Sequence, residues 1–275
     1  MTTILHYKSS PLALLATHWR NRSLIVQMVR REISSRYKGS VLGILWAFIQ
    51  PLILLLVYTF VFSEVFNARW GTQVASKTDF ALALFTGITI YNLFAEVATR
   101  SPSLIISHAN YVKKIIFPLE TLPAIAIGSA SVQMLISIAT ILVINFVLNG
   151  SFSPAIAALP FILLPYVLFI AGLSWLLAAL GVYIRDIGQS VSLITSVSMF
   201  LSPIFYPISA LPEKYQVWLH LNPLTLIIEE SRKVILWNTW PDWLSLAKYS
   251  AASAVLAALG FFWFQRSRKG FADVL

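Results

Sequence analysis

Long apolar runs constrain this chain more than any other feature. Six stretches are dominated by aliphatic and aromatic residues, and a run of about 20 such residues is long enough to cross a bilayer as a helix. Charged residues make up only 11% of the chain, against about a quarter in soluble domains. The sequence therefore predicts an all-α integral membrane protein with six transmembrane helices. The predicted spans are residues 41–62, 80–99, 122–148, 156–183, 190–206 and 244–264.

The spans divide the chain into three predicted regions. Residues 1–40 form a cytoplasmic N-terminal segment, residues 41–264 the transmembrane domain, and residues 265–275 a cytoplasmic tail. Within the first region, residues 22–38 place apolar side chains on one helical face and basic ones beside it. This pattern is typical of an amphipathic helix that lies in the membrane interface. The chain contains no cysteine, which excludes disulfides and thiolate metal sites.

The basic residues indicate an orientation. Six of the 20 Lys and Arg residues fall in the segments on one side of the predicted membrane: Arg69, Lys77, Lys214, Arg232, Lys233 and Lys248. The other 14 share a side with both ends of the chain, so the positive-inside rule places both termini in the cytoplasm. Since these basic residues adjoin apolar spans and do not cover a soluble face, nucleic acid is not an expected partner.

The cytoplasmic segment between the second and third spans predicts a short amphipathic helix that Pro118 would end. Apolar Tyr111, Val112, Ile115 and Ile116 recur at helical spacing, with Lys113 and Lys114 between them. One interpretation is a docking element for an ATPase encoded elsewhere, and the other is a membrane-surface loop with ordinary inside lysines. The next cytoplasmic loop carries an adjacent basic and acidic pair, Arg185 and Asp186, which is a second candidate contact for such a partner.

Several spans carry uncharged polar and aromatic side chains at helical spacing. The candidates for a transport pathway are Trp46, Gln50, Tyr58, Tyr91 and Ser196. Such a wall suits a neutral, hydroxyl-rich, extended substrate, because sugar rings lie on aromatic faces while their hydroxyls seek polar side chains. The alternative is helix packing through small and hydroxyl residues, together with interfacial aromatic belts. Glu96 is the one acidic residue inside a span, and Arg100 at i+4 offers it a local ion pair.

The outer segment between the fifth and sixth spans is broken by prolines. Residues 202–242 contain five prolines and apolar pieces too short to cross the membrane. Broken helices at membrane depth are tolerated where they pack on protein or line a cavity, so re-entrant helices over the outer mouth of a pathway are one interpretation. An ordinary folded external loop is the other. Glu229 and Lys233 have the i, i+4 spacing of a helix-stabilising ion pair.

Five ordered motifs together resemble a known family. They are VRREISSRYKGSVLGILWAFIQPL at 29–52, NYVKKIIFPLETLP at 110–123, GVYIRDI at 181–187, SPIFYP at 202–207 and LNPLTLIIEESRKVIL at 221–236. The chain resembles the membrane subunit of type-2 ABC exporters of polysaccharides, the branch that includes O-antigen, capsule and teichoic acid permeases. The resemblance extends from residue 23 to the C-terminus and is greatest to the O-antigen exporter membrane subunit.

The resemblance implies a subunit of the bacterial inner membrane that is not itself an enzyme. It implies a homodimer, two copies of a separate cytoplasmic ATPase, and a lipid-linked polysaccharide as cargo. The coupling helix would fall on residues 111–117, the interface helix on 22–38, and re-entrant periplasmic helices within 205–237. The sequence has no GxxxxGK[ST] motif, so no cofactor is expected in this chain, and ATP and Mg²⁺ would be bound by the ATPase.

The basic residues of the interface helix complete this hypothesis. We expect Arg30, Arg31, Arg36 and Lys38 to attract the pyrophosphate of a polyprenyl-linked glycan, or alternatively to hold the helix against anionic lipid. Two other classes of protein remain open on the sequence alone. A secondary transporter would be expected to show internal repeats, and a membrane-embedded lipid-modifying enzyme would need converging acids or metal ligands.

Overall fold

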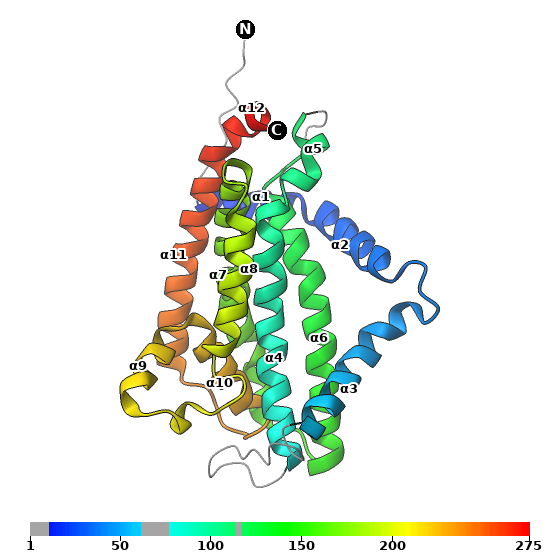
Figure 1. Cartoon of the computed structure of the whole chain (residues 1–275), viewed down its shortest axis with the longest axis vertical. Coiled ribbons are helices and arrows are strands. Elements are labelled where there is room, and N and C mark those ends of the chain that lie inside the picture. The colour runs from blue at the N-terminus through cyan, green and yellow to red at the C-terminus, as the bar shows by residue number, and fades with distance from the viewer. Residues whose placement is uncertain (1–10, 62–76, 114–116) are drawn as a thin grey trace.

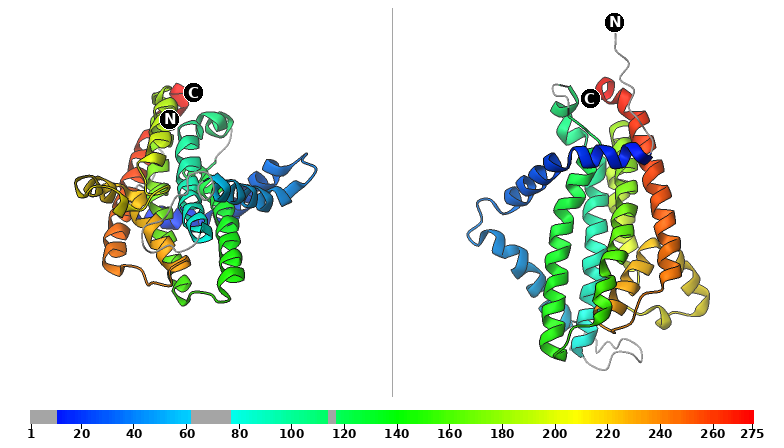
Figure 2. Two further views of the ribbon diagram at one scale, coloured as in Figure 1. Left: turned by 60° about the horizontal axis from the view of Figure 1, so that its bottom comes forward. Right: turned by 180° about the vertical axis from the view of Figure 1, so that it is seen from behind.

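The computed structural model describes residues 11–61, 77–113 and 117–275, and all regular structure in these ranges is helical. The long helices run side by side along one axis, while the N-terminal helices lie across it (Figure 1 and Figure 2). The helices are α1 Pro11–Arg20, α2 Arg22–Tyr37, α3 Trp46–Tyr58, α4 Lys77–Arg100, α5 Ala109–Lys113, α6 Thr121–Asn149, α7 Leu159–Tyr183, α8 Ile187–Phe200, α9 Glu213–Leu221, α10 Pro223–Ile235, α11 Trp243–Ser267 and α12 Phe271–Val274.

Four helical segments of the described chain are long and apolar enough to cross a membrane. They are Thr78–Ser103, Thr121–Asn149, Pro154–Tyr183 and Trp243–Val274, which contain α4, α6, α7 and α11. The second, third, fourth and sixth predicted spans therefore correspond to helices of sufficient length. Helices α7 and α11 pack closely because Gly172 faces Gly260. A Cβ atom added to Gly260 would lie only 2.1 Å from the Gly172 carbonyl oxygen, so this contact depends on small residues.

The first and fifth predicted spans are shorter than expected. In the described part of the chain, the helical run Trp46–Val61, which contains α3, and helix α8, Ile187–Phe200, each have between 10 and 17 residues. At 1.5 Å per residue this is at most about 26 Å, less than the hydrocarbon thickness of about 30 Å. Helix α3 begins late because Gly39 and Gly43 adopt positive φ angles of 84° and 52°, which break the helical path. Helix α8 ends at Phe200, ahead of Pro203, which disfavours a helical conformation for the residue before it.

The predicted amphipathic helix at residues 22–38 is present as α2. Its apolar face contacts the bundle through Ile25, Met28 and Val29, while Arg30 and Arg31 on the opposite side are exposed. Val29 packs against Gly128 of α6, where an added Cβ atom would lie 2.7 Å from a Val29 methyl group. In the view from behind, α1 and α2 run across the bundle (Figure 2). This crossing orientation is compatible with a helix in the membrane interface.

The segment between α8 and α11 folds into two short helices, α9 and α10, held by a buried arginine. Arg232 is fully buried. Its guanidinium donates to the carbonyl oxygens of Ala83, Pro203 and Ile204 at 2.8, 2.6 and 3.1 Å. The bonds to Pro203 and Ile204 satisfy carbonyl groups of the proline-interrupted segment after α8, and the bond to Ala83 links α10 to α4. Gly87 makes room for the side chain, because an added Cβ atom would lie 2.6 Å from Arg232 Nη2.

The ion pair predicted between Glu229 and Lys233 does not form. Glu229 instead accepts from Arg232 at 2.7 Å, and Lys233 donates to Glu230 at 2.8 Å. Both pairs have i, i+3 spacing. The buried Arg232 needs a nearby anion more than the partly exposed Lys233 does, and this need explains why Glu229 turns toward it.

Candidate functional site: a polar cleft between four helices

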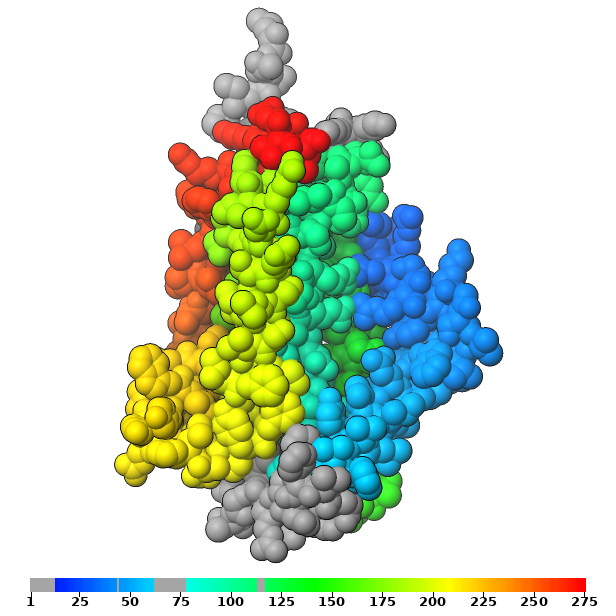
Figure 3. Space-filling model, viewed as in Figure 1, coloured from blue at the N-terminus to red at the C-terminus, as the bar shows by residue number. Residues whose placement is uncertain are grey.

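A cleft of about 810 Å³ lies between α3, α4, α6 and α8, with the C-terminal end of α2 at its rim. Helix α3 inclines away from the bundle, so that in the space-filling view α4 is visible between α8 and α3 (Figure 3). Four of the five residues predicted for a pathway line this cleft: Trp46, Gln50, Tyr91 and Ser196. The predicted positions of three separate apolar helices, α3, α4 and α8, therefore converge on one space.

Each of these four residues contributes differently to the wall. Trp46 and Gln50 of α3 are exposed, and the Trp46 side chain is 40% accessible. Tyr91 is buried at the floor, where its hydroxyl donates to the Thr195 carbonyl and ties α4 to α8. The Ser196 hydroxyl donates back to the Ser192 carbonyl at 2.9 Å and keeps free acceptor capacity.

Tyr58, the fifth predicted pathway residue, does not line the cleft. It is half-buried near the C-terminal end of α3 and packs against the apolar core of the bundle. Gln133 of α6, which was not among the predicted site residues, takes a central position in its place. It accepts from the Tyr37 hydroxyl at 3.0 Å and donates to the Ala47 carbonyl at 3.1 Å, so it connects α2, α6 and α3.

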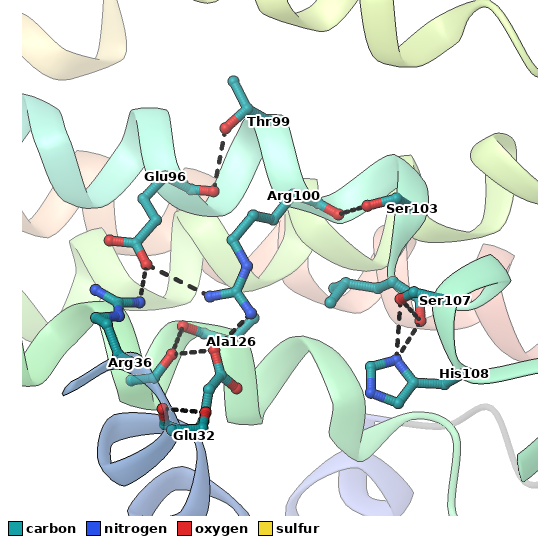
Figure 4. Close-up of polar contacts among 12 residues, drawn as sticks. Glu32, Arg36, Glu96, Thr99, Arg100, Ser103, Ser107, His108 and Ala126 are labelled. Atoms are coloured by element: carbon teal, nitrogen blue, oxygen red, sulfur yellow. Dashed lines mark hydrogen bonds and ion pairs between the residues drawn. The ribbon is translucent and has the colours of Figure 1, made fainter. Parts of the chain in front are cut away.

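A network of ion pairs links α2 to α4 (Figure 4), and two of its members, Arg36 and Glu96, line the rim of the cleft. Glu32 of α2 accepts from Arg100 of α4 at 2.5 Å and from the Ser129 hydroxyl of α6 at 2.8 Å. Glu96 of α4 pairs with Arg36 of α2, and also with Arg100 at 3.4 Å. Helix α2 is therefore held to α4 by ion pairs and to α6 by a hydrogen bond. Each of these four charged side chains is between 24% and 35% exposed.

The predicted local pair between Glu96 and Arg100 is confirmed, but it is one part of a larger arrangement. Partial burial disfavours the charged form of Arg36, yet the hydrogen bond and negative charge of Glu96 outweigh it and raise the pKa of Arg36 above its usual value. Arg36 thus stays positively charged beside the cleft and forms an ion pair with Glu96. Arg30, Arg31 and Lys38, predicted alongside it as anion-attracting residues, are exposed.

Glu32 was not recognised from the sequence as a site residue. It is the one acidic residue of α2 and precedes Arg36 by four positions, which on an isolated helix would indicate a local i, i+4 pair. In the folded protein its carboxylate turns instead to α4 and α6. Only the position of α2 across the bundle reveals this role.

Helix α5 and the turn between α7 and α8, which contain the described residues predicted to contact an ATPase, lie at the end of the bundle that carries α12 (Figure 1). Helix α5 contains Tyr111, Val112 and Lys113. Tyr111 stacks on Phe117 with ring centroids 4.6 Å apart. Lys114 and Ile115 lie outside the described residues. Arg185 and Asp186 are exposed in the turn between α7 and α8.

A second pair of charges braces this end of the molecule. Arg268, after α11, donates to the Glu120 carboxylate at 2.5 Å and to the Phe117 carbonyl at 3.0 Å. Both side chains are largely buried, at 11% and 8% exposure. The Trp175 indole N–H of α7 also donates to the Glu120 carbonyl at 3.0 Å. Phe117 and Glu120, which precede α6, are therefore linked directly to the end of α11, and Glu120 also to α7.

Comparison with known proteins points to a single family. Residues 23–236 match the family described as ABC-2 type transporter. The chain is 28% identical to the O-antigen export system permease protein RfbA of Klebsiella pneumoniae, over 92% of this chain and 95% of that protein. The Myxococcus xanthus protein of the same name is 26% identical over 93% and 96%. The polysialic acid transport protein KpsM of Escherichia coli is 23% identical over 75% and 78%.

Proposed function

This chain belongs to the ABC-2 type transporter family, and we propose that it is the membrane subunit of an ATP-driven exporter that carries a lipid-linked polysaccharide across the bacterial inner membrane. The O-antigen type of polysaccharide is favoured as cargo, because relatives named as O-antigen export permeases align with more than nine-tenths of the chain. The chain would work as a homodimer with two copies of a separate cytoplasmic ATPase, which binds ATP and Mg²⁺.

The cleft is the observation that carries this proposal. Its walls combine an exposed Trp46 with the amide of Gln50 and the hydroxyl of Ser196, and its only lining charges among the described residues are Arg36 and Glu96 at the rim, which pair with each other. An uncharged wall of this kind fits a neutral polymer better than an ion. Aromatic faces bind the C–H faces of sugars and polar side chains bind their hydroxyls.

The interface helix would control access to the cleft. A lipid-linked glycan arrives in the inner leaflet with its pyrophosphate near exposed Arg30, Arg31 and Lys38, where clustered basic residues attract anionic headgroups. Movement of α2 would then require the pairs that Glu32 and Glu96 form with Arg100 and Arg36 to part. A pyrophosphate is a suitable competitor for both guanidinium groups, since arginine binds phosphate and carboxylate with similar geometry.

The ATPase would act through α5 and its neighbours. ATP-driven closure of the two ATPase subunits would displace α5, and the brace formed by Glu120 and Arg268 would pass this displacement to α11 as well as to α6. Helices α3 and α8 of the two protomers would part, and the glycan would move outward along the cleft. No covalent chemistry takes place in this chain.

Loss of the gene in the cell of origin tests the proposed cargo. We expect undecorated lipopolysaccharide at the surface and accumulation of the lipid-linked polymer at the cytoplasmic face of the inner membrane, both reversed by the wild-type chain. A capsule exporter is the second candidate, because KpsM aligns with three-quarters of this chain. Accumulation of capsular polymer, together with normal O-antigen at the surface, would identify the chain as a capsule exporter subunit. Unchanged export of both polymers would refute the proposed function.

A further inference from the structure

A second cavity, of about 770 Å³, lies between α7, α10 and α11, with the end of α9 at one side. It shares no lining residue with the polar cleft. In Figure 1 α9 and α11 lie on the opposite side of the bundle from α3. The cavity is therefore separate from the polar cleft.

The lining of this cavity changes character along α11. Lys248 lies near the start of the helix, Tyr249 and Ser253 follow within about a turn and a half, and Leu256 comes last. At 1.5 Å per residue, Lys248 and Leu256 are separated by roughly 12 Å along the axis. Charge, then hydroxyl groups, then apolar surface is the same order of groups that a membrane lipid presents from its headgroup inward.

The charged end of the cavity carries one cation in excess. Glu230 and Lys233 pair with each other at 2.8 Å. Glu229 also lines the cavity, and it is neutralised by the buried Arg232 at 2.7 Å. Lys248 is exposed, and no carboxylate of the described residues forms an ion pair with it. A single anionic group is therefore the charge that this end of the cavity accepts.

The middle of the cavity is lined by residues whose hydroxyl groups are buried and lack well-formed hydrogen bonds. Thr225 and Ser253 are only 2% and 1% exposed. The Thr225 hydroxyl makes no well-formed hydrogen bond to any described residue, and the Tyr249 and Ser253 hydroxyls interact with each other but form no hydrogen bond with any further described residue. A buried polar group without a partner costs free energy, so groups of this kind indicate a ligand that supplies acceptors. Ester carbonyls are acceptors that lie one step inward from the phosphate of a diacyl lipid.

We propose that this cavity is a binding site for one diacyl phospholipid with an anionic headgroup. Lys248 binds the phosphate, the hydroxyls of Thr225 and Ser253 donate to the ester carbonyls, and an acyl chain follows the apolar walls formed by Phe169, Leu226 and Leu256. The apolar depth distinguishes this site from one for free phosphate or for a glycan. A lipid held here would fill the space between α10 and α11 and support the two short helices.

Lipid retention by the purified full-length chain, with whatever partners co-purify, tests the site. After exchange into vesicles of phosphatidylglycerol or phosphatidylcholine and re-extraction, native mass spectrometry counts the lipid bound per protomer. We expect one phosphatidylglycerol to be retained and phosphatidylcholine to be lost. Lys248→Gln should lower retention about five-fold, because a basic residue near an anionic headgroup contributes about that factor, while Lys248→Arg should restore it.

A matched control and a second variant keep the result interpretable. Lys214→Gln removes an exposed lysine of α9 that does not line the cavity, and it should leave retention unchanged. Thr225→Val keeps the side-chain shape but removes the hydroxyl, and it should weaken retention without loss of folded protein. Equal retention of both lipids, no effect of Lys248→Gln, displacement by soluble glycerophosphate, or capture of a second copy of the chain by a photo-crosslinker at Leu256 would each overturn the proposal.

Discussion

The Glu32 carboxylate of α2 lies 2.5 Å from the Arg100 guanidinium of α4, although the two residues are separated by 68 positions in sequence. This contact fixes a helix that crosses the bundle to one that runs along it. It lies beside the pair between Arg36 and Glu96, which lines the rim of the polar cleft. A displacement of α2 would therefore break contacts at this rim.

Glu32→Gln should loosen α2. The chain has no native cysteine, so a Val29→Cys variant reports the contact between α2 and α6 through its rate of maleimide labelling. Because both carboxylate and guanidinium are partly exposed, the pair is worth at most about 1 kcal/mol, and labelling should accelerate about two- to five-fold. Arg31→Gln, on the exposed side of the same helix, serves as the control. If Arg31→Gln accelerated maleimide labelling as much as Glu32→Gln, the effect would not be specific to the ion pair between Glu32 and Arg100.

Arg268→Gln and Glu120→Gln should uncouple ATP hydrolysis from export. Each removes one partner of a largely buried pair, which we expect to cost about 2 kcal/mol in local stability, less than the full penalty for a completely buried ion. Export per ATP hydrolysed should fall, while ATPase activity of the complex persists. The double reversal Glu120→Arg with Arg268→Glu should recover part of the export. Arg266 is an exposed neighbour of this pair, and Arg266→Gln should export as well as the wild type. A similar loss of export in Arg266→Gln would contradict a coupling role for the pair between Glu120 and Arg268.

Arg232→Lys should destabilise the chain strongly. A lysine cannot reach the three carbonyl oxygens that the guanidinium serves, so we expect a loss of about 3 kcal/mol or more, seen as a lower unfolding midpoint in detergent. Gly87→Ala should cost about 1–3 kcal/mol through the same contact, because the new methyl group meets Arg232 and the Ile204 backbone. Lys214→Gln is the charge-matched control. An unchanged midpoint in Arg232→Lys would show that α10 is held by other contacts.

Trp46→Ala should reduce the export of long polymers about five-fold, because an aromatic contact contributes about 1 kcal/mol beyond its buried area. Trp46→Phe should retain most of the export. Trp263 of α11 is similarly exposed, at 46%, and does not line the cleft, so Trp263→Ala is the matched control. The chain-length distribution of surface polymer, separated on a gel, measures both variants. If Trp46→Ala cells carried surface polymer of normal length and amount, Trp46 would not contact the polymer during export.

The convergence of Trp46, Gln50, Tyr91 and Ser196 could be anticipated from the sequence because polar residues in apolar helices face other protein or water, and helical periodicity assigns them to one face. The same reasoning could not place Tyr58, which has the same composition signal yet packs into the core. Periodicity gives the face of a helix, whereas the neighbour that meets this face depends on tertiary packing.

Charged residues were the hardest to place. Glu32, Glu120 and Arg232 each find partners more than 25 positions away, and local spacing offers no signal for such pairs. The i, i+4 rule even predicted the wrong partner for Glu229, since it takes no account of burial of Arg232. Helix lengths failed for a different reason: positive φ angles at Gly39 and Gly43 shorten α3 although the hydropathy of the run is continuous.

Transport by reconstituted vesicles tests the central claim most directly, namely that this chain is a conduit opened by an ATPase that it does not contain. Vesicles would hold the purified chain with or without the ATPase, and the protected fraction of a radiolabelled lipid-linked glycan would be followed over time. We predict translocation only when the chain, the ATPase and hydrolysable ATP are all present. Translocation at the same rate by vesicles that contain this chain alone would contradict the account.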